Sequence, residues 1–251
     1  MKHKGLLFLL QTRAPIWLCA IWSWQEFRNR NTRRKSARAR GAHFTTRDAF
    51  RATSATLKLD SDWFTGKIPS WLLAFDRVGF AATSPLRCLE IGSWQGLSAY
   101  FTLWHFKQAH LTCVDTWQGS DEHKDGTFAT ADVLSTIEQD FDANLAPFAD
   151  RLTKYRGTSL SYFAATPAEE RFDLIYVDGS HDCADVLTDA VHSFQRLRVG
   201  GLVIFDDYMW DYYDDPLDNP AAAINAFVRL YARKLRVIGA GRQLLCVKTA
   251  D

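Results

Sequence analysis

Short apolar runs alternate with longer segments of helical period along most of the chain beyond Gly41. Such runs are typical of strands buried in a sheet, whereas apolar residues spaced three and four apart indicate amphipathic helices. The predicted strands are 87–91, 111–115, 152–156, 173–178, 202–206, 235–238 and 243–247. The predicted helices are 94–107, 130–146, 182–197 and 220–232.

This alternation predicts the architecture. Strands that alternate with helices form crossover units, so we expect an α/β fold with a mostly parallel sheet and helices on both faces. Only residues 239–242 separate the last two strands, and a crossover needs a dozen or more residues, so the last strand must be antiparallel to its neighbour. We expect a Rossmann-like, seven-stranded sheet with an antiparallel strand in a C-terminal hairpin. The aromatic-rich segment 61–80 is predicted to be a helical flap against the ligand edge of the sheet.

The charge divides the chain into two parts. The net charge is only +1, but residues 1–41 hold ten Lys and Arg against the single acid Glu26, and the remainder holds 20 basic and 28 acidic residues. We therefore expect a basic, partly apolar N-terminal extension, 1–41, and one domain, 42–251. Because the basic residues are not spread over the domain, no specific nucleic-acid partner is expected.

The extension contains two apolar runs, 5–10 and 14–24, and a basic tract, 28–40, with seven Lys and Arg. Neither run reaches the ~20 apolar residues that span a bilayer, and Arg13 interrupts any secretory signal, so a cytoplasmic protein is expected. Five widely spaced cysteines without a CxxC pair agree with reduced thiols. Two interpretations of residues 1–40 stay open: a disordered leader, or a peripheral contact with the anionic inner membrane surface.

Glycines follow the first predicted strand. Gly92 and Gly96 let the backbone turn sharply and approach a ligand at the start of a helix, although two glycines there are often only a tight loop. Asp115 ends the second strand, where an acid accepts hydrogen bonds from ribose hydroxyls. Together they indicate an adenosine site. The spacing is not GxGxxG, which disfavours a dinucleotide.

Three carboxylates fall at the tips of two strands that are expected to be adjacent: Asp178 after the fourth run, and Asp206 and Asp207 after the fifth. Hard oxygen ligands that converge in this way suit Mg²⁺ or Mn²⁺, and His181 lies three residues beyond the first acid. The alternative is that each Asp caps the helix or loop that follows it. Three acids beside a histidine favour a functional site.

Five motifs together resemble a known family. They are LEIGSWQGLSA, VDTWQGS, FDLIYVDGSH, DVLTDAV and VGGLVIFDDYMW. Over residues 62–247 the chain is similar to class I S-adenosylmethionine-dependent methyltransferases, and within them to methyltransferase domain family 24, relatives of catechol O-methyltransferase. The resemblance implies the seven-stranded sheet of that class and S-adenosylmethionine as cofactor.

The resemblance also implies roles for individual residues. The methionine part of the cofactor is expected near the glycine loop, its ribose on Asp115, and its adenine near Trp117 and the turn 157–159. The full implied cofactor set is Glu90, Gly92, Ser93, Trp94, Gly96, Ser98, Asp115, Trp117, Thr158, Ser159 and Asp178. The implied metal ligands are Asp178, Asp206 and Asp207. Catechol relatives place a lysine base where this chain has His181, so His181, with Asp178, is the expected catalytic group.

The expected reaction is O-methylation of a small-molecule or sugar hydroxyl. A histidine of reference pKa ~6.5 is a competent base near neutrality. The segment 209–220 mixes aromatic and acidic residues and is expected to be a lid over a sugar or polyol acceptor. Two other classes stay open: a nucleotide-dependent Rossmann oxidoreductase or epimerase, and a non-catalytic, membrane-tethered binding module. A homo-oligomer is compatible with the sequence.

Overall fold

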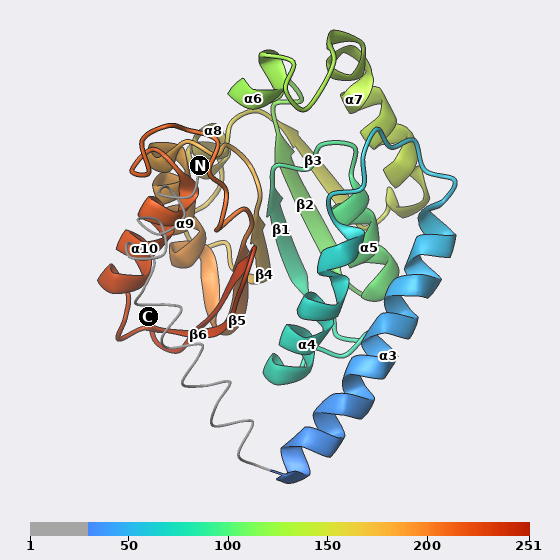
Figure 1. The fold of residues 1–251 in the computed structure, drawn as a ribbon, viewed down its shortest axis with the longest axis vertical. Helices are drawn as coiled ribbons and strands as arrows, with labels where there is room; N and C mark the ends of the chain where they lie inside the picture. Colours follow the sequence, from blue (N-terminus) through green and yellow to red (C-terminus); the bar gives the residue numbers. More distant parts are fainter. Residues whose placement is uncertain (1–29) are drawn as a thin grey trace.

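The computed structural model describes the backbone of residues 30–251 and the side chains of 41–251 other than 122. Within this range, seven strands form one sheet in the order β3-β2-β1-β4-β5-β7-β6 (Figure 1). β7 pairs antiparallel with β5 and β6, and the other pairs are parallel. The strands are β1 Arg87–Ile91, β2 His110–Asp115, β3 Leu152–Arg156, β4 Phe172–Val177, β5 Leu197–Phe205, β6 Leu235–Ala240 and β7 Leu244–Lys248.

Helices cover both faces of the sheet, with a hydrophobic core on each side (Figure 1). One face carries α3 Arg30–Ser54, α4 Ile68–Val78, α5 Leu97–His105 and α7 Ala131–Leu145. The other carries α8 Ser159–Ala165, α9 Cys183–Arg196 and α10 Pro220–Leu230. The short elements are η1 Thr65–Lys67, α6 Asp121–Lys124 and η2 Ala146–Phe148. The predicted fold class is therefore confirmed, including the antiparallel C-terminal strand.

Among the elements that differ from the sequence prediction are α8 and β5. α8 has only seven residues, too few for its period to show in the sequence, and it begins where the Thr158 side chain accepts a hydrogen bond from the Ser161 N–H. β5 begins at Leu197, five residues before the predicted strand, because its first part is exposed and carries no apolar run. Both differences arise where apolar patterning is weak.

The segment 61–80 folds as η1 followed by α4, so a helical flap is confirmed. Trp71 is fully buried and packs edge-on against Tyr176 of β4, with ring centroids 4.8 Å apart. Its indole N–H donates to Gln243 Oε1 at 3.0 Å, which ties the flap to the turn between β6 and β7. Most aromatic residues of the flap therefore pack in the core, but Trp63 is 43% exposed.

Helix α3 crosses the predicted domain boundary. It runs from Arg30 to Ser54, so residues 41 and 42 lie inside one helix. His43 Nε2 lies 2.8 Å from Asp76 Oδ2 of α4, and Phe50 is fully buried against Phe101. Residues 1–29, with both apolar runs, lie outside the described residues, and the role of 1–40 stays a prediction. No helix in 30–251 has the length and apolarity to cross a membrane.

Deleting residues 1–40 should leave the fold intact, because so basic a tract contributes little to a core and the remaining part of α3 keeps the contacts of His43 and Phe50. We expect the thermal midpoint to change by less than about 4 °C, which is about 1 kcal/mol in a chain of this size. Phe50→Ala in the truncated chain is the matched control and should lower the free energy of unfolding by about 3 to 5 kcal/mol. A drop on truncation as large as that of the control would contradict the prediction.

Candidate active site

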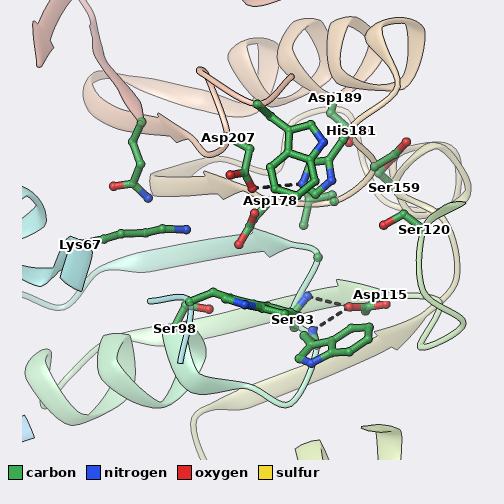
Figure 2. Close-up of a pocket in the computed structure, with 18 of the residues that line it drawn as sticks. Lys67, Ser93, Ser98, Asp115, Ser120, Ser159, Asp178, His181, Asp189 and Asp207 are labelled. Carbon is green, nitrogen blue, oxygen red and sulfur yellow. Dashed lines mark hydrogen bonds and ion pairs between the residues drawn. The ribbon is translucent and has the colours of Figure 1, made fainter. Parts of the chain in front are cut away.

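A cavity of about 1550 Å³ lies along the carboxyl ends of β1, β2, β4 and β5. Its walls come from the flap, the loop after β2, the start of α9 and the turn between β6 and β7 (Figure 2). Pockets for one small ligand commonly measure about 300 to 1000 Å³. The cavity therefore has room for a cofactor and a second molecule, at the edge of the sheet where α/β folds bind ligands.

The loop after β1 approaches β4 closely. Gly92 has φ +80°, and a Cβ there would overlap the carbonyl oxygen of Asp178. Its N–H donates to Val114 O at 2.9 Å. Trp94, two residues on, also has a left-handed backbone, with φ 47°. Only glycine fits position 92, because both the backbone angle and the space exclude a side chain.

Asp115 holds this loop in place. Its Oδ2 accepts from the N–H groups of Ser93 at 2.7 Å and Trp94 at 2.9 Å, and its Oδ1 accepts from the Trp117 N–H at 2.7 Å (Figure 2). A carboxylate offers about four acceptor positions, so three are occupied by backbone donors. One position remains for a ligand hydroxyl, which agrees with the predicted ribose contact.

Eight of the eleven predicted cofactor residues line the cavity: Gly92, Ser93, Trp94, Ser98, Asp115, Thr158, Ser159 and Asp178. Glu90, Gly96 and Trp117 do not. Glu90 is 1% exposed and accepts from Ser98 Oγ at 3.0 Å. Burial raises the pKa of Glu90 to about 8, although hydrogen bonds from serine hydroxyls oppose the rise. Glu90 therefore holds the start of α5 through Ser98 and does not line the cavity.

Trp117, which was predicted near the adenine, does not line the cavity. Trp117 is buried and packs against Phe141 of α7, with ring centroids 4.9 Å apart. Its indole N–H donates to Trp94 O at 3.0 Å. Gly96 likewise faces Leu145 and Phe141 of α7. Trp117 has a left-handed backbone, with φ 51°, and its ring packs on α7. Its bond to Trp94 O therefore ties the glycine loop to α7.

Two carboxylates and the histidine converge on one point. Ligand atoms of Asp178, His181 and Asp207 all lie within 4.8 Å of one another. His181 Nε2 is 3.1 Å from Asp207 Oδ2 (Figure 2). Asp207 has φ 47°, a conformation rare for a residue with a side chain and often found at functional sites. The predicted adjacency of the fourth and fifth strand tips is confirmed.

The structure does not bring Asp206 into this group. Its Oδ2 accepts from Lys67 Nζ, from the Tyr176 hydroxyl and from Gln243 Nε2, the last at 3.2 Å. Its Oδ1 accepts from the Asp207 N–H at 2.8 Å. These four donors fill the acceptor capacity of a carboxylate. The structure therefore groups two of the three predicted carboxylates, Asp178 and Asp207, with His181.

Lys67 and Tyr176 are site residues that the sequence did not identify. Burial lowers the pKa of Lys67, but the charges of Asp178, Asp206 and Asp207 outweigh it, so the pKa lies above its usual value. The single Tyr176 hydroxyl proton faces both Asp206 and Asp178, the latter at 2.7 Å. Burial, with the charge of Asp206, raises the pKa of Asp178 well above its usual range. Asp178 therefore favours a protonated or cation-bound state.

Aromatic rings from separate loops meet over the cavity. His123 stacks on Trp94, with ring centroids 4.5 Å apart, and Trp63 lies 5.8 Å from both rings. On the other side, Trp210 lies over His181 at 4.9 Å and against Phe128 at 5.0 Å. Trp210 belongs to the segment predicted as a lid. Trp63, His123 and Phe128 were missed because no local pattern relates loops so far apart in the sequence.

Comparisons with known proteins relate this fold to methyltransferases. Residues 89–208 match the family model of a methyltransferase domain. Cofactor-bound Rv0187 from MTB is 18% identical, with a TM-score of 0.53 over 85% of this chain and 90% of that one. The O-methyltransferase TomG from Streptomyces achromogenes, in complex with SAM, is 15% identical, with a TM-score of 0.50 over 81% and 96%.

A third solved structure is the MycE methyltransferase of the mycinamycin pathway, in complex with Mg, SAH and mycinamycin VI. It is 16% identical, with a TM-score of 0.56 over 81% of this chain and 54% of that one. No curated protein matches the sequence.

The seven-stranded sheet has the Rossmann-like fold of solved methyltransferase structures. Residues 89–208, which include the glycine loop, are similar to a methyltransferase domain. These matches favour the methyltransferase prediction over the oxidoreductase or epimerase alternative.

Replacing Gly92 by alanine should lower the free energy of unfolding far more than replacing Gly79 by alanine. Both have φ near +80°, but a Cβ at Gly79 meets nothing within 4 Å, whereas at Gly92 it overlaps backbone. We expect Gly92→Ala to cost about 3 kcal/mol or more and Gly79→Ala about 1 kcal/mol, measured by urea unfolding. Equal losses in the two variants would contradict the close approach of the glycine loop to β4.

Removing the Lys67 ammonium group should leave a buried carboxylate without its cation. The Asp206 side chain is fully buried, so Lys67→Met should lower the free energy of unfolding by about 3 kcal/mol. Lys124→Met, which removes an exposed lysine at the cavity edge, is the control and should change it by less than about 0.5 kcal/mol. The double variant Lys67→Met with Asp206→Asn should recover part of the loss, and no recovery would count against the ion pair.

Proposed function

We propose that the protein is an S-adenosylmethionine-dependent O-methyltransferase that methylates a hydroxyl group of a small molecule with the help of a divalent cation. The observation that carries this proposal is the convergence of Asp178, His181 and Asp207 in the cavity that also contains the Asp115 glycine loop. One half of the cavity thus suits a cofactor, and the other suits a hydroxyl to be activated.

The arrangement of the strand tips supports this use. The methionine part of the cofactor would lie along Gly92 and Trp94 and the ribose at Asp115. The N-terminus of α5 lies beyond the glycine loop, and its N–H groups favour a carboxylate. The sulfonium centre would then face Asp178 and His181, which line the same cavity.

The donor set suits a divalent cation. The carboxylates of Asp178 and Asp207 fit Mg²⁺ or Mn²⁺ and would hold it, which leaves the nearby imidazole of His181 for proton transfer. Such a cation, when bound, polarises a coordinated hydroxyl and favours its ionisation. MycE, which has the same fold, was solved with Mg and SAH. Asp206 is already saturated with donors, so we do not assign it as a ligand.

His181 would act as the general base. Its Nε2 faces the point where the acids converge and would take the hydroxyl proton, while Asp207, 3.1 Å away, favours the imidazolium that forms. The substrate oxygen would then attack the sulfonium methyl, and S-adenosylhomocysteine would leave. Trp210 over the imidazole limits the access of water.

The acceptor is proposed to be a sugar or another polyol. Trp63 and Trp210 present aromatic rings at the cavity, and Lys67 and Gln243 add polar groups. Flat apolar faces beside hydrogen-bonding groups suit a ring that carries several hydroxyls. A screen of sugar, polyol and phenol acceptors with labelled S-adenosylmethionine, with and without Mg²⁺, tests the class.

His181→Ala should lower turnover by roughly 10²- to 10⁴-fold, the usual share of general base catalysis. Its affinity for S-adenosylhomocysteine, measured by calorimetry, should stay within about threefold of the parent, because the imidazole acts on the acceptor. His110→Ala is the control, since His110 is exposed at the opposite end of β2. Chelator should abolish turnover, and Mg²⁺ or Mn²⁺ should restore it. Full activity of His181→Ala, or full activity in chelator, would refute the corresponding part of the mechanism.

A further inference from the structure

One arm of the cavity has no role in the chemistry proposed above. It lies between the turn after β3, the loop after β4 and the first turns of α9 (Figure 2). It is lined by Gly157, Thr158, Ser159, Leu160, Gly179, Ser180, Asp182, Asp185, Thr188 and Asp189. Asp189 differs from the other two α9 acids here because it is only 3% exposed, while Asp185 is exposed and Asp182 caps the helix.

The position of this arm relates it to the base of the cofactor. The reactive methyl must face the acids after β4 and β5, and the ribose is expected at Asp115 on the tip of β2. The Gly157 N–H donates to Asp115 O at 2.8 Å, so the turn after β3 adjoins the ribose position. Gly157 and Gly179 give this arm walls without side chains, which suits a flat ring. Adenine therefore belongs in this arm.

Asp189 lies at the floor of the arm. A Cβ added to Gly179 would be 3.6 Å from Asp189 Oδ2, which places the carboxyl directly behind that bare backbone. Among the described residues, no Lys, Arg or His forms an ion pair with Asp189, and Ser159 is its hydrogen-bonding neighbour. Burial raises the pKa of Asp189 to about 7, and the Ser159 hydrogen bond opposes the rise. A buried carboxyl with spare acceptor positions is costly unless a donor reaches it.

Adenine carries a suitable donor. Its exocyclic amino group has two N–H bonds at the edge of a flat ring, and amino groups of this kind pair with oxygen acceptors in proteins. We propose that Asp189 recognises the adenine of the cofactor by accepting a hydrogen bond from this amino group. Asp189 is then a specificity residue for the cofactor. The inference rests on the proposed function, because it requires the cavity to bind S-adenosylmethionine.

The test compares two ligands that differ only in the amino group. Calorimetry measures the affinity of the purified protein for S-adenosylhomocysteine and for its purine analogue, in which hydrogen replaces the 6-amino group. The parent protein should prefer S-adenosylhomocysteine by at least tenfold, the effect expected of one hydrogen bond to a charged or buried acceptor. Asp189→Leu should bind the two ligands with affinities within threefold of each other. Asp189→Asn should keep most of the preference, since the amide oxygen still accepts.

Asp132→Leu is the control. It removes an exposed acid in the first turn of α7, outside the cavity, and should keep the preference of the parent. If Asp189→Leu does not fold, Asp189→Ala removes the acceptor with a smaller side chain and gives the same comparison.

The outcomes separate this inference from the proposed function. If the parent binds neither ligand, the proposed function fails and the inference fails with it. If the parent binds both ligands equally, or if Asp189→Leu keeps the parental preference, the inference is overturned while the proposed function stands.

Discussion

The buried carboxylate of Asp206 constrains the carboxyl edge of the sheet. A buried charge is costly unless it is fully hydrogen-bonded, and Asp206 obtains its donors from Lys67 of the flap, Tyr176 of β4 and Gln243 of the hairpin turn. Gln243 in turn accepts from the Trp71 indole of α4. Satisfying one carboxylate therefore fixes three separate elements relative to one another. The wall of the cavity between the flap and the hairpin is a consequence of that requirement.

Acids at the ends of neighbouring strands have different tasks, which follow from the donors that reach them. Asp115 accepts three backbone N–H groups and shapes the glycine loop, with one position left for a ligand. Asp206 is saturated, and its neighbour Asp207 is turned toward His181 by a left-handed backbone. A strand followed by an acid looks the same in the sequence in each case. The number of hydrogen-bond donors that the protein supplies decides whether the carboxylate has only a structural role or can also bind a ligand.

Much of the fold could be predicted because it depends on local patterns. Strands buried on both faces need continuous apolar runs, and the three residues between β6 and β7 are too few for a parallel connection. The position of Trp117 could not be predicted in this way, because its ring packs on α7 and does not line the cavity. Lys67 shows the other limit, since it meets an acid 139 positions away. Contacts of that range depend on how the flap packs, which no local pattern encodes.

The loop after β2 relates the two halves of the cavity physically. His123 stacks on Trp94 of the glycine loop, and Phe128 of the same loop packs on Trp210, which lies over His181. Tyr212 adds a hydrogen bond to Asp125, so the lid and this loop are joined by a polar contact as well as by rings. One loop therefore contacts the glycine loop through His123 and the segment over His181 through Asp125 and Phe128.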